Sequence, residues 1–454
     1  GRNAVDDHVI EMRLRVKRQK KYYLKCAGCG FVTPSFKAWF DQFQKCPNCG
    51  SKHSEVWYNT SYKRLPRFIK GNPQNFWHYF PYLPLVLKRH IITRYEGTVP
   101  IERWHFLEEF AKKEYGLTLE IYAYRNDLNG GTGTFKDVAA ALAASIFKEN
   151  NLKQYCIAST GNSATAYAKY LSIAGVNCSV FMPEDAIRAS EATISSFGQQ
   201  VFRVMGDYAK AKEVAAEYAR RHHIQMSTGN IDPIRIEAKK TMVFEWLRQL
   251  GKAPDVYIQA ISGGTGPLAI DKGIREIGHL YPDLQNPRFI MVQSDGCDPM
   301  VQAWEKAEAE GFPEGFEKNY PVIDNPKTNV PTLATGNPAT YPIISKLVRK
   351  TGGSFVRMRE SKLIPLGKLI AYEQKMVPGP ASTVCVAGFF NALKKNLIND
   401  GETVMVNIGE GAVRAPYFLE QMIYTTQEVT NADECAPHEI DGYRDQLWKD
   451  VLND

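Results

Sequence analysis

From Lys136 onward, short apolar segments alternate with longer segments rich in alanine and charged residues. Apolar segments of this kind are typical of strands, and they occur at 154–160, 177–184, 199–206, 224–228, 254–262, 288–295 and 403–409. Segments with helical character lie at 137–145, 161–175, 191–198 and 208–222. Upstream, residues 94–127 predict a turn, a helix and a strand. Strands and helices that alternate along a chain predict an α/β fold with largely parallel sheets.

Composition and charge narrow the class of protein. The 454 residues suffice for two or three domains, and the net charge of +7 suits an anionic small substrate. That charge is too small to indicate nucleic-acid binding, and we interpret the basic run Lys17–Lys25 as a solvated edge. No apolar run approaches the roughly 20 residues that span a bilayer, and the charged N-terminus lacks the apolar core of a secretory signal. We therefore expect a cytoplasmic protein that binds neither nucleic acid nor membrane.

Two cysteine pairs near the N-terminus predict a metal site. Cys26 and Cys29 form one Cys-x-x-Cys pair, Cys46 and Cys49 form another, and sixteen residues separate the pairs. Each pair makes a tight turn whose thiolates converge on one ion, and four thiolates complete the tetrahedral shell of Zn²⁺. We expect a structural zinc ribbon, with a nucleic-acid-binding ribbon as the alternative. The other five cysteines are scattered, which indicates reduced thiols in a reducing compartment.

A glycine-rich turn at 129–135 places Lys136 at the start of an alanine-rich helix. A lysine that attacks a carbonyl must be partly neutral, and the positive end of a helix opposes its protonation. The small residues before it let a flat ring approach the backbone. Lys136 is therefore a candidate reagent, and a plain structural helix start is the alternative.

Two further turns follow predicted strands. The first carries several hydrogen-bond donors at a helix start: Ser159, Thr160, Asn162 and Ser163. Such a set can hold a carboxylate, whereas ordinary helix capping needs only one of them. The second is a phosphate-sized cup made of Ser262, Gly263, Gly264, Thr265 and Gly266. It lacks the spacing of a Walker or dinucleotide-binding loop.

Because ligands bind beyond the carboxyl ends of parallel strands, these three turns predict one shared pocket. A reactive lysine, a phosphate cup and a carboxylate loop together indicate pyridoxal phosphate and an amino-acid substrate.

With these motifs in place, the chain resembles the fold-type II pyridoxal-phosphate enzymes, which are tryptophan synthase β-like, and most closely the threonine synthase group. The resemblance covers about residues 95 to 415. It rests on the segments "YEGTVPI" (95–101), "GTGTFKD" (131–137), "STGNSATA" (159–166), "NIDPIRIEAKKT" (230–241), "SGGTG" (262–266) and "GPASTVCVAG" (379–388).

The resemblance implies a role for each matched residue. Lys136 would be the Schiff-base lysine, and Asn162 would bond the ring hydroxyl of the cofactor. Arg235 would bind a phosphorylated substrate. The substrate carboxylate would lie on Ser159, Thr160 and Ser163. The cofactor phosphate would lie on the loop Ser262–Gly266.

Four features depart from the group's pattern, and one of them is an extra glycine in the lysine loop. Ile408 stands where the group has a threonine that meets the pyridine nitrogen, and Asn407 is the candidate substitute. Gly379 replaces the glutamate of an E-P-A-S segment, and Gly229-Asn230 replaces an Asn-Ser pair. These changes cast doubt on threonine synthase activity itself but leave the cofactor in place.

Cysteate synthase, a sister of threonine synthase, also resembles the chain in its paired cysteines, its Trp77–Pro84 connector and its "TGTFK" loop. We therefore expect an enzyme that eliminates phosphate from an O-phospho-amino acid and adds a nucleophile, favoured as O-phosphoserine plus sulfite. Alternatives are threonine synthase and a zinc-ribbon binding protein with an inactive domain. A serine/threonine dehydratase would leave Arg235 and the ribbon without a role.

The expected organisation has four parts. A zinc-ribbon region covers 1–55, a large cofactor-binding domain covers 56–145 and 229–425, a small α/β domain covers 146–228, and a polar tail covers 426–454. Family likeness also implies a homodimer.

Overall fold

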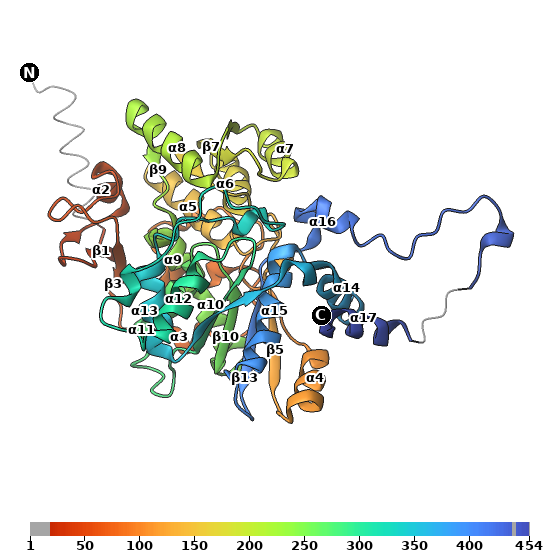
Figure 1. Ribbon diagram of the computed structural model, residues 1–454. Helices are drawn as coiled ribbons and strands as arrows, with labels where there is room; N and C mark the ends of the chain where they lie inside the picture. The colour runs from red at the N-terminus through yellow and green to blue at the C-terminus, as the bar shows by residue number, and fades with distance from the viewer. Residues whose placement is uncertain (1–18, 438–441, 454) are drawn as a thin grey trace, which may run out of the picture.

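The computed structural model describes residues 19–437 and 442–453. The charged N-terminal segment, including the first two residues of the basic run Lys17–Lys25, lies outside the described residues. So do four residues of the C-terminal tail and the last residue. The chain forms three sheets, each with its own helices (Figure 1). No helix in the described part of the chain combines the length and apolar character needed to cross a membrane.

The first sheet is a small antiparallel ribbon. Its strands β1 (Tyr22–Cys26), β2 (Val32–Thr33) and β3 (Ser54–Tyr58) are joined by helix α2 (Phe36–Asp41). Leu24, Phe36 and Trp39 are buried in the same core cluster as Tyr155 of the second sheet, so the ribbon packs onto the body. Lys21 is not solvated, because its Nζ donates to two carbonyl oxygens, those of Phe80 and Leu85.

The second sheet is fully parallel, in the order β8-β7-β6-β9. Its strands are β6 (Gln154–Ala158), β7 (Asn177–Pro183), β8 (Gln200–Val204) and β9 (Gln225–Met226). Its helices are α6 (Asn162–Ile173), α7 (Arg188–Ser196) and α8 (Tyr208–His222). Each predicted strand and helix of this region is present, and α7 starts three residues earlier than the expected 191.

The third sheet has the order β12-β11-β10-β13-β5-β4, and only the edge strand β4 (Ile101–Arg103) is antiparallel. The other strands are β5 (Glu120–Arg125), β10 (Val256–Ala260), β11 (Arg288–Ser294), β12 (Ser354–Met358) and β13 (Thr403–Ile408). The expectation of two α/β units with mostly parallel sheets is therefore confirmed.

Side chains alternate between the two faces of the third sheet and form a separate core on each face. One face of the third sheet packs on α4 (His105–Tyr115), α14 (Leu363–Gln374) and α15 (Pro380–Lys394). The opposite face packs on α10 (Thr241–Leu250), α11 (Thr265–Ile277), α12 (Pro299–Ala309) and α13 (Tyr341–Thr351). Neighbouring residues of a strand face opposite sides of a sheet. In β13, Val406 and Ile408 accordingly lie in the first core, and Asn407 between them points the other way, toward a cavity.

Helix α5 (Asp137–Glu149) is buried along almost its whole length and packs on α6 and on α9 (Pro233–Lys239). A helix without a solvated face has to be apolar all round, which explains its run of alanines.

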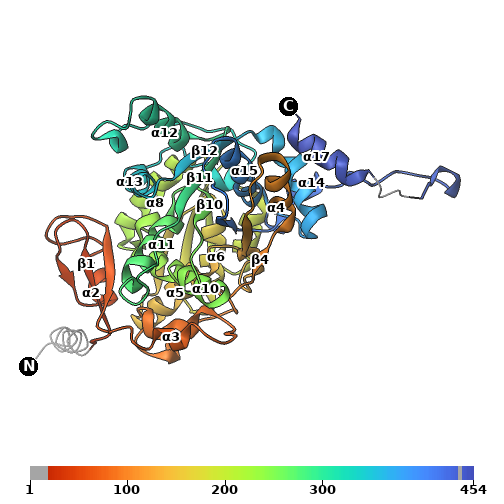
Figure 2. The same cartoon turned by 90° about the horizontal axis from the view of Figure 1, so that it is seen from below.

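The C-terminal tail returns to the body after a projecting segment that follows α16 (Pro416–Glu420) (Figures 1 and 2). Its last helix, α17 (Tyr443–Leu452), packs on α14, with Trp448 stacked on Phe110 at 5.3 Å between ring centroids. The ribbon and α17 lie at opposite edges of the molecule (Figure 2).

Candidate active site

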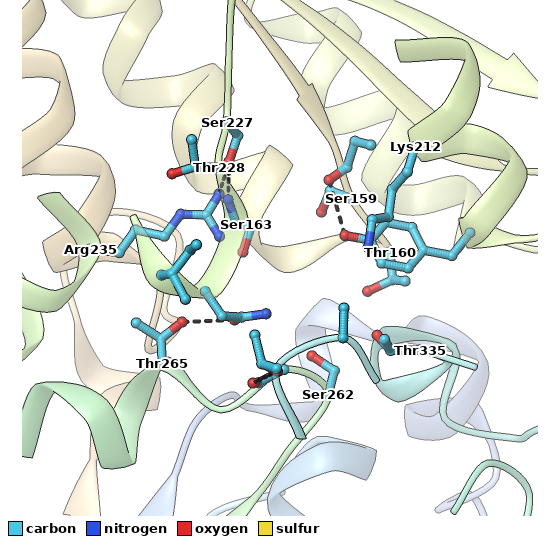
Figure 3. Close-up of a pocket in the computed structure, with 18 of the residues that line it drawn as sticks. Ser159, Thr160, Ser163, Lys212, Ser227, Thr228, Arg235, Ser262, Thr265 and Thr335 are labelled. Carbon is cyan, nitrogen blue, oxygen red and sulfur yellow. Dashed lines mark hydrogen bonds between the residues drawn. The ribbon is translucent and has the colours of Figure 1, made fainter. Parts of the chain in front are cut away.

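A cavity of about 1060 Å³ lies between the two parallel sheets, at the ends of β6, β10 and β13. Its wall includes all of the predicted cofactor and substrate residues except Gly266. They are Lys136, Ser159, Thr160, Asn162, Ser163, Arg235, Ser262, Gly263, Gly264, Thr265 and Asn407. Gly266 faces away, and a Cβ there would lie 2.0 Å from Oε1 of Gln259. Figure 3 shows the hydroxyl groups of several segments, together with Arg235 of α9 (Pro233–Lys239), arranged around this space.

Lys136 is the residue before α5, and its side chain lies in the cavity wall. Burial, and then the charge of Arg235, lower the pKa of its amine from 10.5 to about 8. The neighbouring Lys239 side chain, and then the charge of Glu410, act in the opposite direction. Near neutral pH a useful fraction of this amine is therefore unprotonated and nucleophilic.

The loop before α6 combines capping with free donors. Ser159 Oγ accepts hydrogen bonds from the backbone N–H of Gly161 (3.0 Å) and Ala164 (3.2 Å), so this hydroxyl already satisfies donors at the start of the helix. Thr160 Oγ1 donates to the carbonyl of Thr332 at 2.9 Å. The hydroxyl of Ser163 forms no hydrogen bond with the described residues and lies beside Arg235 (Figure 3). The backbone N–H groups of Asn162 and Ser163 donate no hydrogen bond within the described residues and remain available to an anion.

The loop 262–265 forms a cup at the start of α11. Gly264 has φ +91°, a left-handed conformation that favours glycine. A Cβ on Gly263 would lie 1.6 Å from Nδ2 of Asn230, whose Oδ1 also accepts a hydrogen bond from Thr265 Oγ1 at 2.7 Å. Within the described residues, the backbone N–H groups of Ser262, Gly263 and Gly264 donate no hydrogen bond. The cup therefore has the free donors and the close backbone approach that a phosphate group requires.

Asn407 is held by a relay of side-chain amides. Asn129 Nδ2 donates to Asn126 Oδ1 at 3.0 Å, and Asn126 Nδ2 donates to Asn407 Oδ1 at 2.7 Å. Because this relay occupies the oxygen of Asn407, its NH₂ group is left as a donor for the cavity. Ile408 lies in the apolar core.

Glu410, which sequence reasoning missed, is a buried carboxyl group in the cavity wall. It accepts hydrogen bonds from Asn162 Nδ2 at 2.7 Å and from the backbone N–H of Ala381 at 3.1 Å. Burial raises its pKa. A Cβ on Gly379 would lie 2.6 Å from Cγ of Glu410. Glu410 thus fills the space beside Gly379, the position at which the threonine synthase group has a glutamate.

Arg235 on α9 is almost fully buried. Its Nη2 donates to Ser227 Oγ at 2.8 Å, its Nε donates to the hydroxyl of Tyr167 at 3.3 Å, and its guanidinium lies 5.1 Å from the centre of that ring. It forms no ion pair with a described residue. Lys239 lies one helical turn further along α9, also in the cavity wall and 2% exposed. Arg235 and Lys239 are four residues apart, so the sequence already indicated that they share one face of a helix, but Lys239 was not predicted as a site residue.

The ribbon also reaches the cavity. Phe43, Gln44, Lys45 and Lys52 lie in its wall. Gln44 Nε2 donates to the carbonyl of Met226 at 2.8 Å, which attaches the ribbon to the second sheet. The four sulfur atoms of Cys26, Cys29, Cys46 and Cys49 lie within 4.8 Å of one another, as a four-thiolate metal site requires.

Two parallel α/β units that meet at one cavity, with a lysine amine and a phosphate cup in its wall, define the fold-type II class of pyridoxal-phosphate enzymes. The chain belongs to the family of pyridoxal-phosphate dependent enzymes, whose model matches residues 92–409.

Curated relatives carry the name threonine synthase. The protein from Methanocaldococcus jannaschii is 28% identical over 340 residues, which cover 74% of this chain and 80% of that protein. Those from Halalkalibacterium halodurans and Methanosarcina acetivorans are each 25% identical, over 79% and 85% of this chain and 94% and 90% of their own lengths.

Solved structures support the same fold. Cysteine synthase from Entamoeba histolytica has a TM-score of 0.57 at 14% identity, over 79% of this chain and 94% of its own. Maize serine racemase has a TM-score of 0.57 at 16% identity, over 72% and 93%. At these identities the likeness concerns the fold alone.

Proposed function

We propose that the protein replaces the phosphate of O-phosphoserine by sulfite and so forms cysteate. The observation that carries the proposal is the presence in one cavity of four separate groups: the Lys136 amine, the phosphate cup, the donor loop before α6, and Arg235, which has no ion pair with a described residue. An enzyme for an unphosphorylated amino acid would need only the first three. Arg235 gives the substrate's own phosphate a partner, and the resemblance to cysteate synthase supports sulfite as the second substrate.

The residues fit pyridoxal phosphate. The unpaired N–H groups of the loop 262–264 would hold its phosphate, Lys136 would bind its aldehyde carbon, and Asn407 would donate to its ring nitrogen. When bound, the cofactor supplies an electron-withdrawing ring that stabilises negative charge at the α-carbon of an amino acid.

Each of the site residues would then have a separate role in the reaction. The helix-start donors of α6 hold the substrate carboxylate, and Lys136 Nζ removes the proton from Cα and later returns it. Arg235 neutralises the phosphate as the Cβ–O bond breaks and its electron pair leaves on oxygen. The sulfur lone pair of sulfite then forms the Cβ–S bond. The sum, O-phosphoserine plus hydrogen sulfite giving cysteate plus hydrogen phosphate, balances in atoms and charge.

Threonine synthase is the second candidate, because the curated relatives named above carry that activity in their names. Its substrate, O-phosphohomoserine, is one carbon longer and has the same two anionic groups. A binding protein with an inactive domain is the third candidate.

The four-cysteine cluster fits Zn²⁺ in a structural role, because all four positions are filled by thiolate and none is left for a reacting water. We also propose the homodimer that the resemblance implies and a reducing, cytoplasmic location, in keeping with cysteines that are all free.

Removal of the metal from the four-cysteine cluster with a strong chelator should unfold the ribbon and open the cavity wall near Lys45. The KM of the substrate should rise together with the loss of zinc measured by atomic absorption.

The deciding experiment records the visible spectrum of the purified protein during addition of O-phosphoserine and then O-phosphohomoserine, each with and without sulfite. Free phosphate and amino-acid products are assayed in parallel. Cysteate formed from O-phosphoserine and sulfite supports the proposal. Threonine formed from O-phosphohomoserine selects the second candidate. A colourless protein that cannot be reconstituted with pyridoxal phosphate would select the third.

A further inference from the structure

Two adjacent lysines, Lys239 at the end of α9 and Lys240 directly after it, are both buried but differ in their ionic partners. Lys240 is enclosed by carboxylates, with its Nζ 2.7 Å from Glu237 and 2.9 Å from Glu276. Lys239 is equally buried but forms no ion pair with any described residue. Burying a charge without a partner is costly, and the fold avoids this cost at Lys240. The difference is that Lys239 lines the cavity, where a ligand can supply the missing negative charge.

The surroundings of Lys239 are cationic and apolar. Its Nζ lies 4.4 Å from the centre of the Phe135 ring, and the charge of Lys136 acts on it. Burial, and then the charges of Lys136 and Arg235, hold the pKa of Lys239 well below its ordinary value. A divalent anion placed among these groups would reverse this shift and allow all three to be charged.

Hydroxyl groups complete the same part of the wall. Thr228 Oγ1 is buried and has no hydrogen-bond partner among the described residues. Thr228, Ser227 and Ser163 are grouped around the guanidinium of Arg235 (Figure 3). Buried polar atoms are normally paired, so the unpaired Thr228 hydroxyl, beside a guanidinium that has no ion pair with a described residue, indicates a place for an oxyanion. Two carboxyl groups, Asp232 and Glu410, also act on these cations, but neither is in direct ion-pair contact with them.

We propose that Lys239 adds a second cation to the oxyanion site already expected at Arg235, so that the two together bind a tetrahedral or pyramidal oxyanion apart from the cofactor's phosphate cup. Resting on the proposed function, the same site would hold the departing phosphate and then the entering sulfite. Lys239 would thereby be the residue that adapts the cavity to an inorganic dianion as second substrate.

The test uses the holoenzyme and inorganic phosphate, with sulfate as a second unreactive probe, measured by equilibrium dialysis without turnover. Because the cofactor already occupies the cup, we expect one additional phosphate per chain. Lys239→Gln should weaken this binding about tenfold or more, the change expected from loss of one charge-assisted hydrogen bond. Lys239→Arg, which keeps the charge, should restore most of it. Lys45→Gln, which removes an exposed charge from the cavity wall, is the matched control and should change affinity by less than about twofold.

Two results would overturn the inference. One is the absence of saturable phosphate binding in the wild-type holoenzyme. The other is a Lys239→Gln protein that binds phosphate as tightly as the wild type but has lost turnover, since Lys239 would then serve Lys136 and not an anion. The colour and thermal unfolding of each variant show whether it is folded.

The outcome separates the inference from the proposed function. Phosphate binding that depends on Lys239 in an enzyme that makes no cysteate would retain the anion site and reject the reaction. Cysteate formation with unchanged phosphate affinity and unchanged sulfite KM in Lys239→Gln would do the reverse.

Discussion

The lowered pKa of Lys136 leads to a quantitative prediction about its reaction with the cofactor. At pH 7.5 an amine with a pKa of about 8 is roughly one-quarter neutral, whereas an ordinary lysine amine is about 0.1% neutral. The apoenzyme should therefore combine with pyridoxal phosphate at a rate that rises up to about pH 8 and then levels off. The rate rises with pH because only the unprotonated amine of Lys136 attacks the aldehyde carbon.

Arg235→Gln tests the electrostatic part of this explanation. Burial contributes most to the lowered pKa of Lys136, and the charge of Arg235 contributes next. A single nearby charge shifts a pKa by about one unit or more, so its removal should lower the reconstitution rate at pH 7.5 by roughly tenfold. The midpoint of the rate profile should move to higher pH. The assay is stopped-flow absorbance of the lysine-bound cofactor between pH 6 and 10.

Arg220→Gln is the matched control, because Arg220 lies in the wall of the same cavity but is exposed to solvent. It should leave the midpoint in place, since water screens its charge. An Arg235→Gln profile with an unchanged midpoint, or one displaced to lower pH, would refute the electrostatic explanation of the Lys136 pKa.

Three other substitutions probe the rest of the cavity. Gly263→Ala should weaken cofactor binding at least about tenfold in a fluorescence titration, because its Cβ would collide with Asn230 at 1.6 Å and displace the cup. Asn407→Leu should keep the cofactor bound but alter its absorbance and lower kcat, because the NH₂ donor is lost; an unchanged spectrum would show that Asn407 does not meet the ring. Gly379→Glu should be inactive because it overlaps Glu410, and the double variant Gly379→Glu/Glu410→Gly should recover activity relative to it, a non-additive result that independent sites would not give.

Much of the fold could be predicted because it depends on local pattern. The apolar segments of the second sheet, the alanine-rich helix α5 and the two cysteine pairs were each recognisable within a few dozen residues. The spacing of Cys26, Cys29, Cys46 and Cys49 was sufficient for a four-thiolate cluster, since each pair is a local turn. The last helix, α17, was missed because its stability depends on Trp448 packing against distant aromatic rings.

The site was predictable to the extent that glycine and hydroxyl residues follow strands in a parallel sheet. That rule brought Lys136 and the loops at 159–163 and 262–265 to one pocket before their distances were known. It could not foresee that Gly266 turns away toward Gln259, because the direction of a residue in a helix start depends on the neighbouring strand.

By itself, then, the sequence determined the class of fold, the ribbon and the loops that carry the chemistry, because each is written in contiguous residues with a fixed period or spacing. Only the tertiary structure decided which groups share a space. Glu410 lies beside Gly379, the amide of Asn407 is oriented through Asn126, and Lys239 is buried without a counter-charge among the described residues. These are relations between residues that are distant in the chain or hidden from solvent, and the physical costs of desolvation and overlap that govern them arise only when the chain is packed.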